Sequence, residues 1–161
     1  MTKKLYNLIE SGFGRAINYS DEERELYGNV NLNCAERILR GANIVYKLGL
    51  SEEALRVSAP FGGGMGIESV CGAITGALMV LGALYTDRAE KNTPLKDEIT
   101  VPFIKEVRRR QGGLSCTHNK KYAQTDPFDS TPVVLAIAKV LDETIEKIEA
   151  TSSSPTFARS L

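Results

Sequence analysis

Three cysteines, Cys34, Cys71 and Cys116, are the residues of this sequence with the most distinctive chemistry. They form no Cys-x-x-Cys pair, which excludes a thioredoxin-type redox pair and a zinc-ribbon knuckle. An odd number of cysteines, in a chain whose beginning shows no export signal, is not typical of a secreted disulfide framework. The spacing therefore points to free, metal-binding or redox-cycling thiols.

The local sequence around each cysteine predicts a stabilised thiolate. Cys34 and Cys71 fall at predicted helix starts, where unpaired amides and the positive end of the helix favour negative charge. Cys116 lies between the basic segments 108–110 and 120–121, whose cations act in the same direction. We expect Cys71 to be the most reactive thiol. The alternative is that the cysteines only fill space in the core, as free cysteines often do.

A glycine-rich loop precedes Cys71 and contains Gly62, Gly63, Gly64 and Gly66. Glycines allow positive φ angles and a close approach of the backbone to a ligand. Their amides could line a cofactor, anion or sulfur site at the start of the next helix. No Lys-Ser or Lys-Thr follows, so the loop is not a P-loop.

Together these segments resemble a known family of bacterial redox-active proteins. Segment 33–39 (Asn-Cys-Ala-Glu-Arg-Ile-Leu) is similar to the family's first cysteine helix. Segment 60–66 (Pro-Phe-Gly-Gly-Gly-Met-Gly), followed by the Cys-Gly-Ala-x-x-Gly pattern that begins at Cys71, is similar to its central signature, and Cys116 to its third cysteine. The resemblance covers about residues 28–148. It identifies the chain as a member of the family written C_GCAxxG_C_C.

The resemblance also implies a fourth cysteine just before the last helix, where this chain has Ser130-Thr131-Pro132. A four-thiolate metal site is therefore incomplete here. His118, the only histidine, follows Cys116 by two residues and could supply a fourth ligand, because imidazole binds zinc and iron.

Three functions follow from these residues. In the first, Cys34, Cys71 and Cys116 are the catalytic thiols of a redox protein, a thiol-based oxidoreductase that cycles between dithiol and disulfide. In the second, the same cysteines, with His118, bind a metal ion or an iron–sulfur cluster. In the third, the chain is a structural or partner-binding helical protein whose redox site has eroded.

The chain is expected to be an all-α protein. The pattern predicts one helical domain over residues 1–150, a bundle of about five to seven helices, and a disordered tail over 151–161. The region 114–130 is predicted to have no regular secondary structure. Gly72, Gly76 and Gly82 recur in one apolar helix, which suggests close helix packing. Helices are expected at 3–16, 33–48, 51–59, 69–85, 94–111 and 131–149.

Composition restricts the partners. Lys plus Arg equals Asp plus Glu at 20 each, so the charge balance indicates neither nucleic acid nor an anionic membrane as the main partner. The apolar run 70–85 is too short to span a membrane. We expect a cytoplasmic protein that acts on a redox partner or a small molecule. The apolar face of the helix at 70–85 could pack within one chain or across a homodimer.

Overall fold

Eight α-helices build the part of the chain that the computed structural model describes, residues 3–15, 19–28, 31–86, 94–123 and 129–151. No β-strand occurs in these ranges, so the predicted all-α class is confirmed. Residues 152–161 of the predicted tail lie outside them. The helices are α1 (Lys4–Glu10), α2 (Asp21–Tyr27), α3 (Cys34–Val45), α4 (Glu52–Arg56), α5 (Gly72–Tyr85), α6 (Val101–Gln111), α7 (Cys116–Tyr122) and α8 (Thr131–Thr151).

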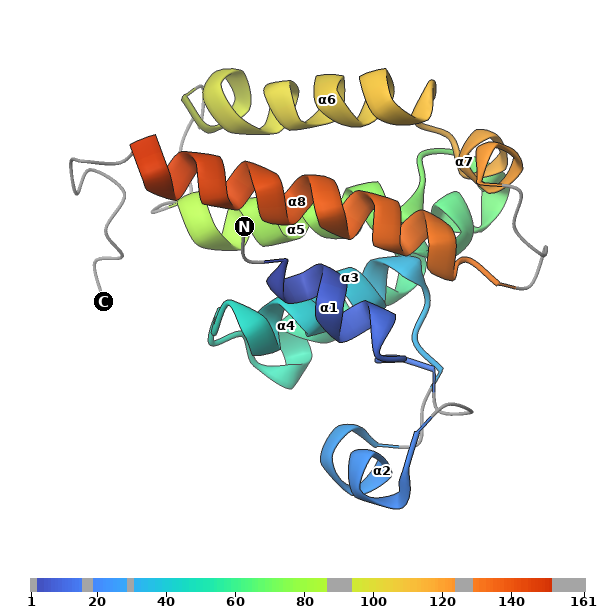
Figure 1. The fold of residues 1–161 in the computed structure, drawn as a ribbon. Coiled ribbons are helices and arrows are strands. Elements are labelled where there is room, and N and C mark those ends of the chain that lie inside the picture. The colour runs from blue at the N-terminus through green and yellow to red at the C-terminus, as the bar shows by residue number, and fades with distance from the viewer. Residues whose placement is uncertain (1–2, 16–18, 29–30, 87–93, 124–128, 152–161) are drawn as a thin grey trace.

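Helices α3, α5 and α8 form the centre of the fold (Figure 1). The most extensive packing joins α3 and α5, and α8 contacts both of them. Helix α1 packs on α8 and α3, and α6 packs on α8 from another side. Helix α2 stands apart from this group in the ribbon view (Figure 1). Three short helical turns complete the described chain: η2 (Ala59–Phe61), η3 (Gly64–Glu68) and η4 (Leu95–Thr100).

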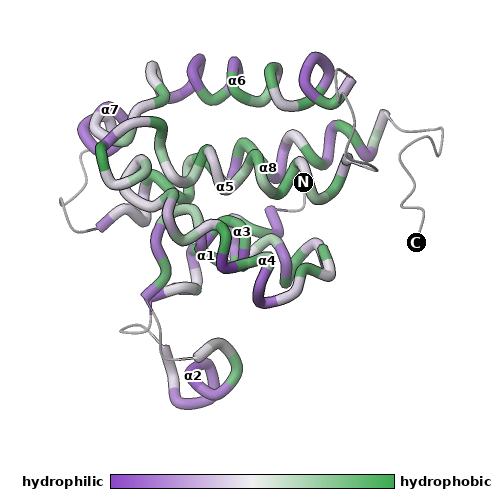
Figure 2. The backbone as a smooth tube through the Cα atoms, turned by 180° about the vertical axis from the view of Figure 1, so that it is seen from behind, coloured by the Kyte–Doolittle hydropathy of each residue, from purple (hydrophilic) through white to green (hydrophobic). Residues whose placement is uncertain are grey.

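The core follows the apolar faces of the central helices. Figure 2 shows α5 as a largely hydrophobic helix, whereas α6 alternates between hydrophobic and hydrophilic positions. Because α5 is apolar on most sides, it is enclosed by α3, α8 and η4. Burial of this apolar surface is the main force that holds the bundle together.

Local capping explains where the central helices begin. The Asn33 side chain accepts hydrogen bonds from the backbone N–H groups of Ala35 and Glu36, and Glu36 bonds back to the Asn33 N–H. This is the capping box that the sequence predicts, and it places Cys34 as the first residue of α3. The long last helix is also confirmed, because α8 runs from Thr131 to Thr151.

Two predictions about the elements need correction. The region 114–130, expected to be irregular, contains α7, which starts where the Ser115 hydroxyl accepts a bond from the His118 N–H. Its sequence carries too few apolar residues to show a helical stripe, and the cap alone marks its start. The first helix is shorter than the predicted 3–16 and ends at Glu10, before Gly12 and Gly14 adopt positive φ angles.

Two of the three glycines of α5 are required by packing. A Cβ atom at Gly76 would lie 2.8 Å from the carbonyl oxygen of Ala35 in α3, and one at Gly72 would lie 2.6 Å from the carbonyl oxygen of Phe61. Gly82 has nothing within 4 Å of its Cβ position. The expectation of close packing thus holds for Gly72 and Gly76 and is wrong for Gly82.

This contrast gives a stability prediction with its own control. Gly76→Ala should lower the free energy of unfolding by about 1–3 kcal/mol, because the methyl group pushes α5 away from the backbone of α3. Gly82→Ala, in the same helix, should raise it by up to about 1 kcal/mol, because alanine favours a helix. Urea unfolding of both variants tests this. Equal effects of the two substitutions would contradict the close contact of α3 and α5.

Within the described residues, no helix is long and apolar enough to cross a membrane. This agrees with the interpretation of the apolar run as the buried helix α5.

Candidate functional site

Cys34 is held at the start of α3 by contacts on both sides of its cap. The Asn33 Nδ2 group donates a 2.9 Å hydrogen bond to the carbonyl oxygen of Ala59, which ties α3 to η2. Gly62 packs against the Asn33 side chain so closely that a Cβ atom there would lie 2.5 Å from it. The Cys34 side chain is buried among these segments, with 9% of its surface exposed.

Cys71 and Cys116 are joined by a short backbone pairing. Residues 69–71 run antiparallel to residues 114–116. The N–H of Cys71 donates to the carbonyl oxygen of Leu114 at 2.8 Å, and the N–H of Cys116 donates to the carbonyl oxygen of Ser69 at 2.6 Å. Val70 and Ser115 lie opposite each other in this pairing, and each cysteine directly follows one of them. Because side chains alternate along an extended strand, both cysteine side chains lie on the same side of the pairing.

Cys34 completes a cluster with these two thiols. Its Cβ atom lies 3.4 Å from where a Cβ would stand on Gly72, the neighbour of Cys71. Negative charge on Cys34 or Cys116 raises the pKa of Cys71, and charge on Cys34 raises the pKa of Cys116. The fold therefore brings the three sequence-predicted cysteines together, and all three are free thiols.

Burial opposes the reactive thiolate that the sequence predicts at Cys71. Cys71 is the N-cap of α5 rather than a residue of its first turn, and it is 2% exposed. Burial raises the pKa of its thiol to about 11. The backbone amides of Ala73 and Ile74 do lower this pKa, as a helix start should, but desolvation is the larger effect.

The basic residues near Cys116 lower the pKa of its thiol less than expected, because burial of the thiol opposes them. Burial raises the pKa of Cys116, and only Lys120 among the predicted cations lowers it. Arg109 and Arg110 instead pair with Glu106 of their own helix, at 2.8 and 2.6 Å. The basic run is thus largely a helix end with its own carboxylate partner.

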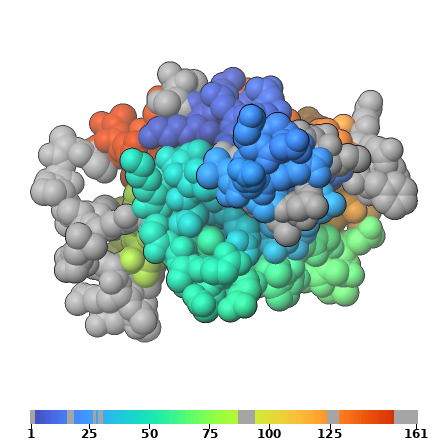
Figure 3. Space-filling view, turned by 90° about the horizontal axis from the view of Figure 1, so that it is seen from below, coloured from blue at the N-terminus to red at the C-terminus, as the bar shows by residue number. Residues whose placement is uncertain are grey.

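The glycine-rich loop covers the cysteines from one side. Gly64 has a φ of 62°, and a Cβ atom on it would lie 2.8 Å from the Cβ of Cys116. Gly63 and Gly66 also have positive φ angles, and Gly62 packs on the cap of α3. Figure 3 shows this green segment on the surface at one end of the molecule. Its use as a cofactor or anion site stays a prediction.

His118 lies beside Cys116 in sequence but bonds elsewhere. Its Nε2 atom is 2.7 Å from the carbonyl oxygen of Gln111, which can only accept a hydrogen bond, so this nitrogen is the donor. The ring packs against Gly113 and stacks on Tyr122 with centroids 6.0 Å apart. Only Nδ1 would be left to bind a metal.

A metal centre receives no support from the donor arrangement. Across the described ranges, no group of three or more His, Cys, Asp or Glu side chains is arranged to hold a metal ion. The set of Cys34, Cys71, Cys116 and His118 therefore does not fit a metal or cluster as these residues stand. Metal binding stays a prediction of the sequence.

Arg37 is a residue of this site that sequence reasoning missed. It is 1% exposed, although arginine is rarely buried unless it is paired. Its Nη1 atom donates a 2.9 Å hydrogen bond to the hydroxyl of Thr131, one of the residues at the place where the resemblance implies a fourth cysteine. The signal in the sequence is its position one helical turn after Cys34, on the same face of α3.

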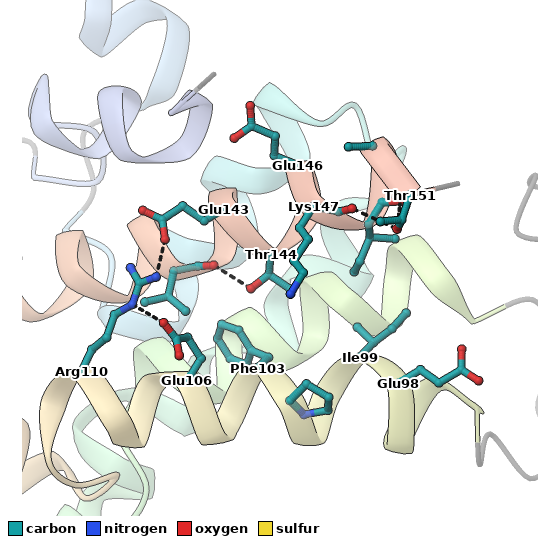
Figure 4. Close-up of a pocket in the computed structure, with 14 residues that line it drawn as sticks. Glu98, Ile99, Phe103, Glu106, Arg110, Glu143, Thr144, Glu146, Lys147 and Thr151 are labelled. Carbon is teal, nitrogen blue, oxygen red and sulfur yellow. Dashed lines mark hydrogen bonds and ion pairs between the residues drawn. The ribbon is translucent and has the colours of Figure 1, made fainter. Parts of the chain in front are cut away.

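A wide groove lies away from the thiols. It occupies about 820 Å³ between η4, α6 and α8, with Phe103 at its floor and an Arg110 ion pair at one end (Figure 4). Arg110 bridges Glu106 and Glu143, at 2.6 and 2.5 Å. None of the cysteines lines this groove.

Comparison with known proteins gives one match. No curated protein and no solved structure matches the chain. The family described as "Putative redox-active protein (C_GCAxxG_C_C)" matches residues 32–150, which include the three cysteines, the glycine-rich loop and α3 to α8. Because this match covers more than half of the chain, it shows that the chain belongs to that redox-active family.

Proposed function

We propose that the chain is a dithiol–disulfide exchange protein, in which two of its three clustered thiols pass electrons to a disulfide of a partner. The observation that carries this proposal is the cluster itself. Three free cysteines from the starts of α3, α5 and α7 lie under one glycine-rich loop. Membership of a redox-active family supports the same function.

The exchange proceeds in two displacement steps. A thiol of the site loses its proton to water, and the resulting thiolate attacks one sulfur of the partner's disulfide. A mixed disulfide forms, and the other partner sulfur leaves as a thiolate that takes a proton from water. A second thiol of the site loses its proton and attacks the mixed disulfide. An internal disulfide results, the second partner thiol leaves, and two electrons have passed to the partner.

The test is a redox titration of the whole chain. The reduced protein is equilibrated with mixtures of glutathione and glutathione disulfide, the free thiols are blocked with iodoacetamide, and peptides are mapped by mass spectrometry. We expect two of the three thiols to be lost together and to be regained on reduction, with one internal disulfide that includes Cys34. The third thiol should stay free.

Single substitutions provide the matched controls. Cys34→Ser should abolish the internal disulfide, whereas substitution of the third, unpaired cysteine should leave it intact. Helical circular dichroism shows whether each variant is folded. If only glutathione adducts form at every ratio, the proposal is wrong. If a metal that resists a chelator is bound through all three cysteines, the metal-binding function replaces it.

A further inference from the structure

The buried guanidinium of Arg37 is held in one place by two other segments of the chain. Its Nε donates to the carbonyl oxygen of Phe13 at 3.0 Å, and its Nη1 donates to Thr131 at 2.9 Å. Gly14 packs on its stem, since a Cβ atom there would lie 2.6 Å from the Arg37 Cγ. The group is thus positioned by contacts with α8 and with the segment after α1.

Within the described part of the chain, the charge of Arg37 has no dedicated partner. Its Nη2 atom is buried and makes no hydrogen bond to any described residue. Asp129 acts on Arg37 only at a distance, because its carboxylate is bonded to the Thr131 N–H at 3.0 Å and pairs with Arg15 at 3.6 Å. A buried cation is costly unless an anion lies near it.

Cys34 is the group that can supply this anion. It precedes Arg37 by one helical turn on the same face of α3. Charge on Cys34 is the largest of the effects that stabilise the Arg37 cation, whereas burial and Arg15 oppose it. Side chains of an α-helix lean toward its N-terminus, so the stem of Arg37 lies over the turn that begins at Cys34.

Among the described residues, neither of the other two thiols is affected by a buried cation. The effects that lower the pKa of Cys71 come from backbone amides and from no cationic side chain. Cys116 has Lys120, a partly exposed residue in the last turn of α7. Cys34 is also the most exposed of the three, at 9% against 2% and 3%.

We propose that Arg37 is a positioning residue that stabilises negative charge on the Cys34 sulfur and so makes Cys34 the thiol that attacks the partner's disulfide. The inference rests on the proposed exchange function and assigns the order within it. Cys34 forms the mixed disulfide, and Cys71 or Cys116 then displaces the partner from it. When the internal disulfide is reduced, Cys34 is the sulfur released with negative charge.

The first test needs no substitution. The reduced wild-type chain is mixed with a small deficit of dithiodipyridine, the reaction is quenched with acid, and the modified cysteine is identified by mass spectrometry. We expect the first adduct at Cys34. A first adduct at Cys71 or Cys116 overturns the proposal.

The second test removes the charge. Arg37→Gln keeps hydrogen-bonding capacity and should slow adduct formation at Cys34 by about tenfold. It should also lower the reduction potential of the internal disulfide, because reduced Cys34 loses its cation. Arg37→Lys should retain most of the wild-type rate. Arg40→Gln, a charge removal one turn further along α3 where Arg40 pairs with Glu52, is the matched control and should leave the rate unchanged.

The outcomes separate the two proposals. If Arg37→Gln is folded and reacts at the wild-type rate, the role of Arg37 is wrong even when the internal disulfide still forms. If Cys34 reacts first and slows in Arg37→Gln, but no internal disulfide follows, the role of Arg37 stands and the exchange function is wrong. Should Arg37→Gln fail to fold, the adduct map of the wild-type chain still decides the order.

Discussion

At pH 7, Cys71 in the folded protein should react with iodoacetamide at least about 100-fold more slowly than a cysteine in a short peptide. Only the thiolate reacts, and burial raises the pKa of Cys71 to about 11. The rate should rise about tenfold per pH unit up to that value. Mass spectrometry of the three cysteine peptides, at short reaction times from neutral to alkaline pH, measures this rate.

The same pKa makes a prediction for stability. The folded state holds the Cys71 proton more tightly than the unfolded state, whose thiol has the ordinary value of 9.0. As pH rises from about 9 to about 11, the unfolded chain therefore loses this proton first, and the free energy of unfolding should fall by about 3 kcal/mol. Below about pH 9 this contribution does not change with pH.

Cys71→Ala is the control for both measurements. It removes the titrating thiol and leaves the other alkaline groups, such as Tyr46 and Tyr85, in place. The variant should lose stability less steeply above pH 9 than the wild-type chain. Parallel pH profiles for the two proteins, or labelling of Cys71 at the rate of a peptide thiol, would show that burial does not control this cysteine.

Asp142→Ala should cause the largest loss of stability among single substitutions outside the thiol cluster, about 3–5 kcal/mol. The Asp142 carboxylate is 3% exposed and accepts hydrogen bonds from the N–H groups of Leu5 and Tyr6, at 3.1 and 2.9 Å, and from the hydroxyl of Tyr46. It thereby caps α1 from α8. Alanine would leave these three donors, one buried and two partly buried, without their acceptor.

Two milder variants calibrate this effect. Tyr46→Phe removes one donor and should cost about 1 kcal/mol, and Asp142→Asn keeps one acceptor oxygen and should fall between the two. Urea unfolding gives the magnitudes, and hydrogen exchange should show that α1 loses protection before α5 does. An Asp142→Ala variant as stable as the wild-type chain would mean that α1 is not held by this carboxylate.

The sequence was most informative where structure depends on neighbouring residues. The Asn33 and Glu36 capping box predicts the start of α3, because a cap acts within one helical turn. Thr131, expected as the cap of the last helix, is instead the first residue of α8. The family match also agrees with the motif around Cys71. The low-polarity run 70–85 was correctly interpreted as a buried helix, since its composition already requires an apolar environment.

The sequence was less informative where two distant segments meet. Helix α7 carries no apolar stripe, so only the Ser115 cap marks it. Gly76 and Gly82 look alike in the sequence, but only Gly76 faces the backbone of another helix. Arg37 reads as a surface residue, because nothing in its own helix shows that Phe13 and Thr131 enclose it.

The thiol site combines both kinds of information. The sequence by itself determined that Cys34 and Cys71 lie at helix starts and that the chain carries the pattern of a redox-active family. Only the tertiary structure decided that the pKa of the Cys71 thiol lies above its ordinary value. The local effect of the α5 amides on its pKa is present, but desolvation by the packed helices is larger, and desolvation depends on contacts that no local pattern records.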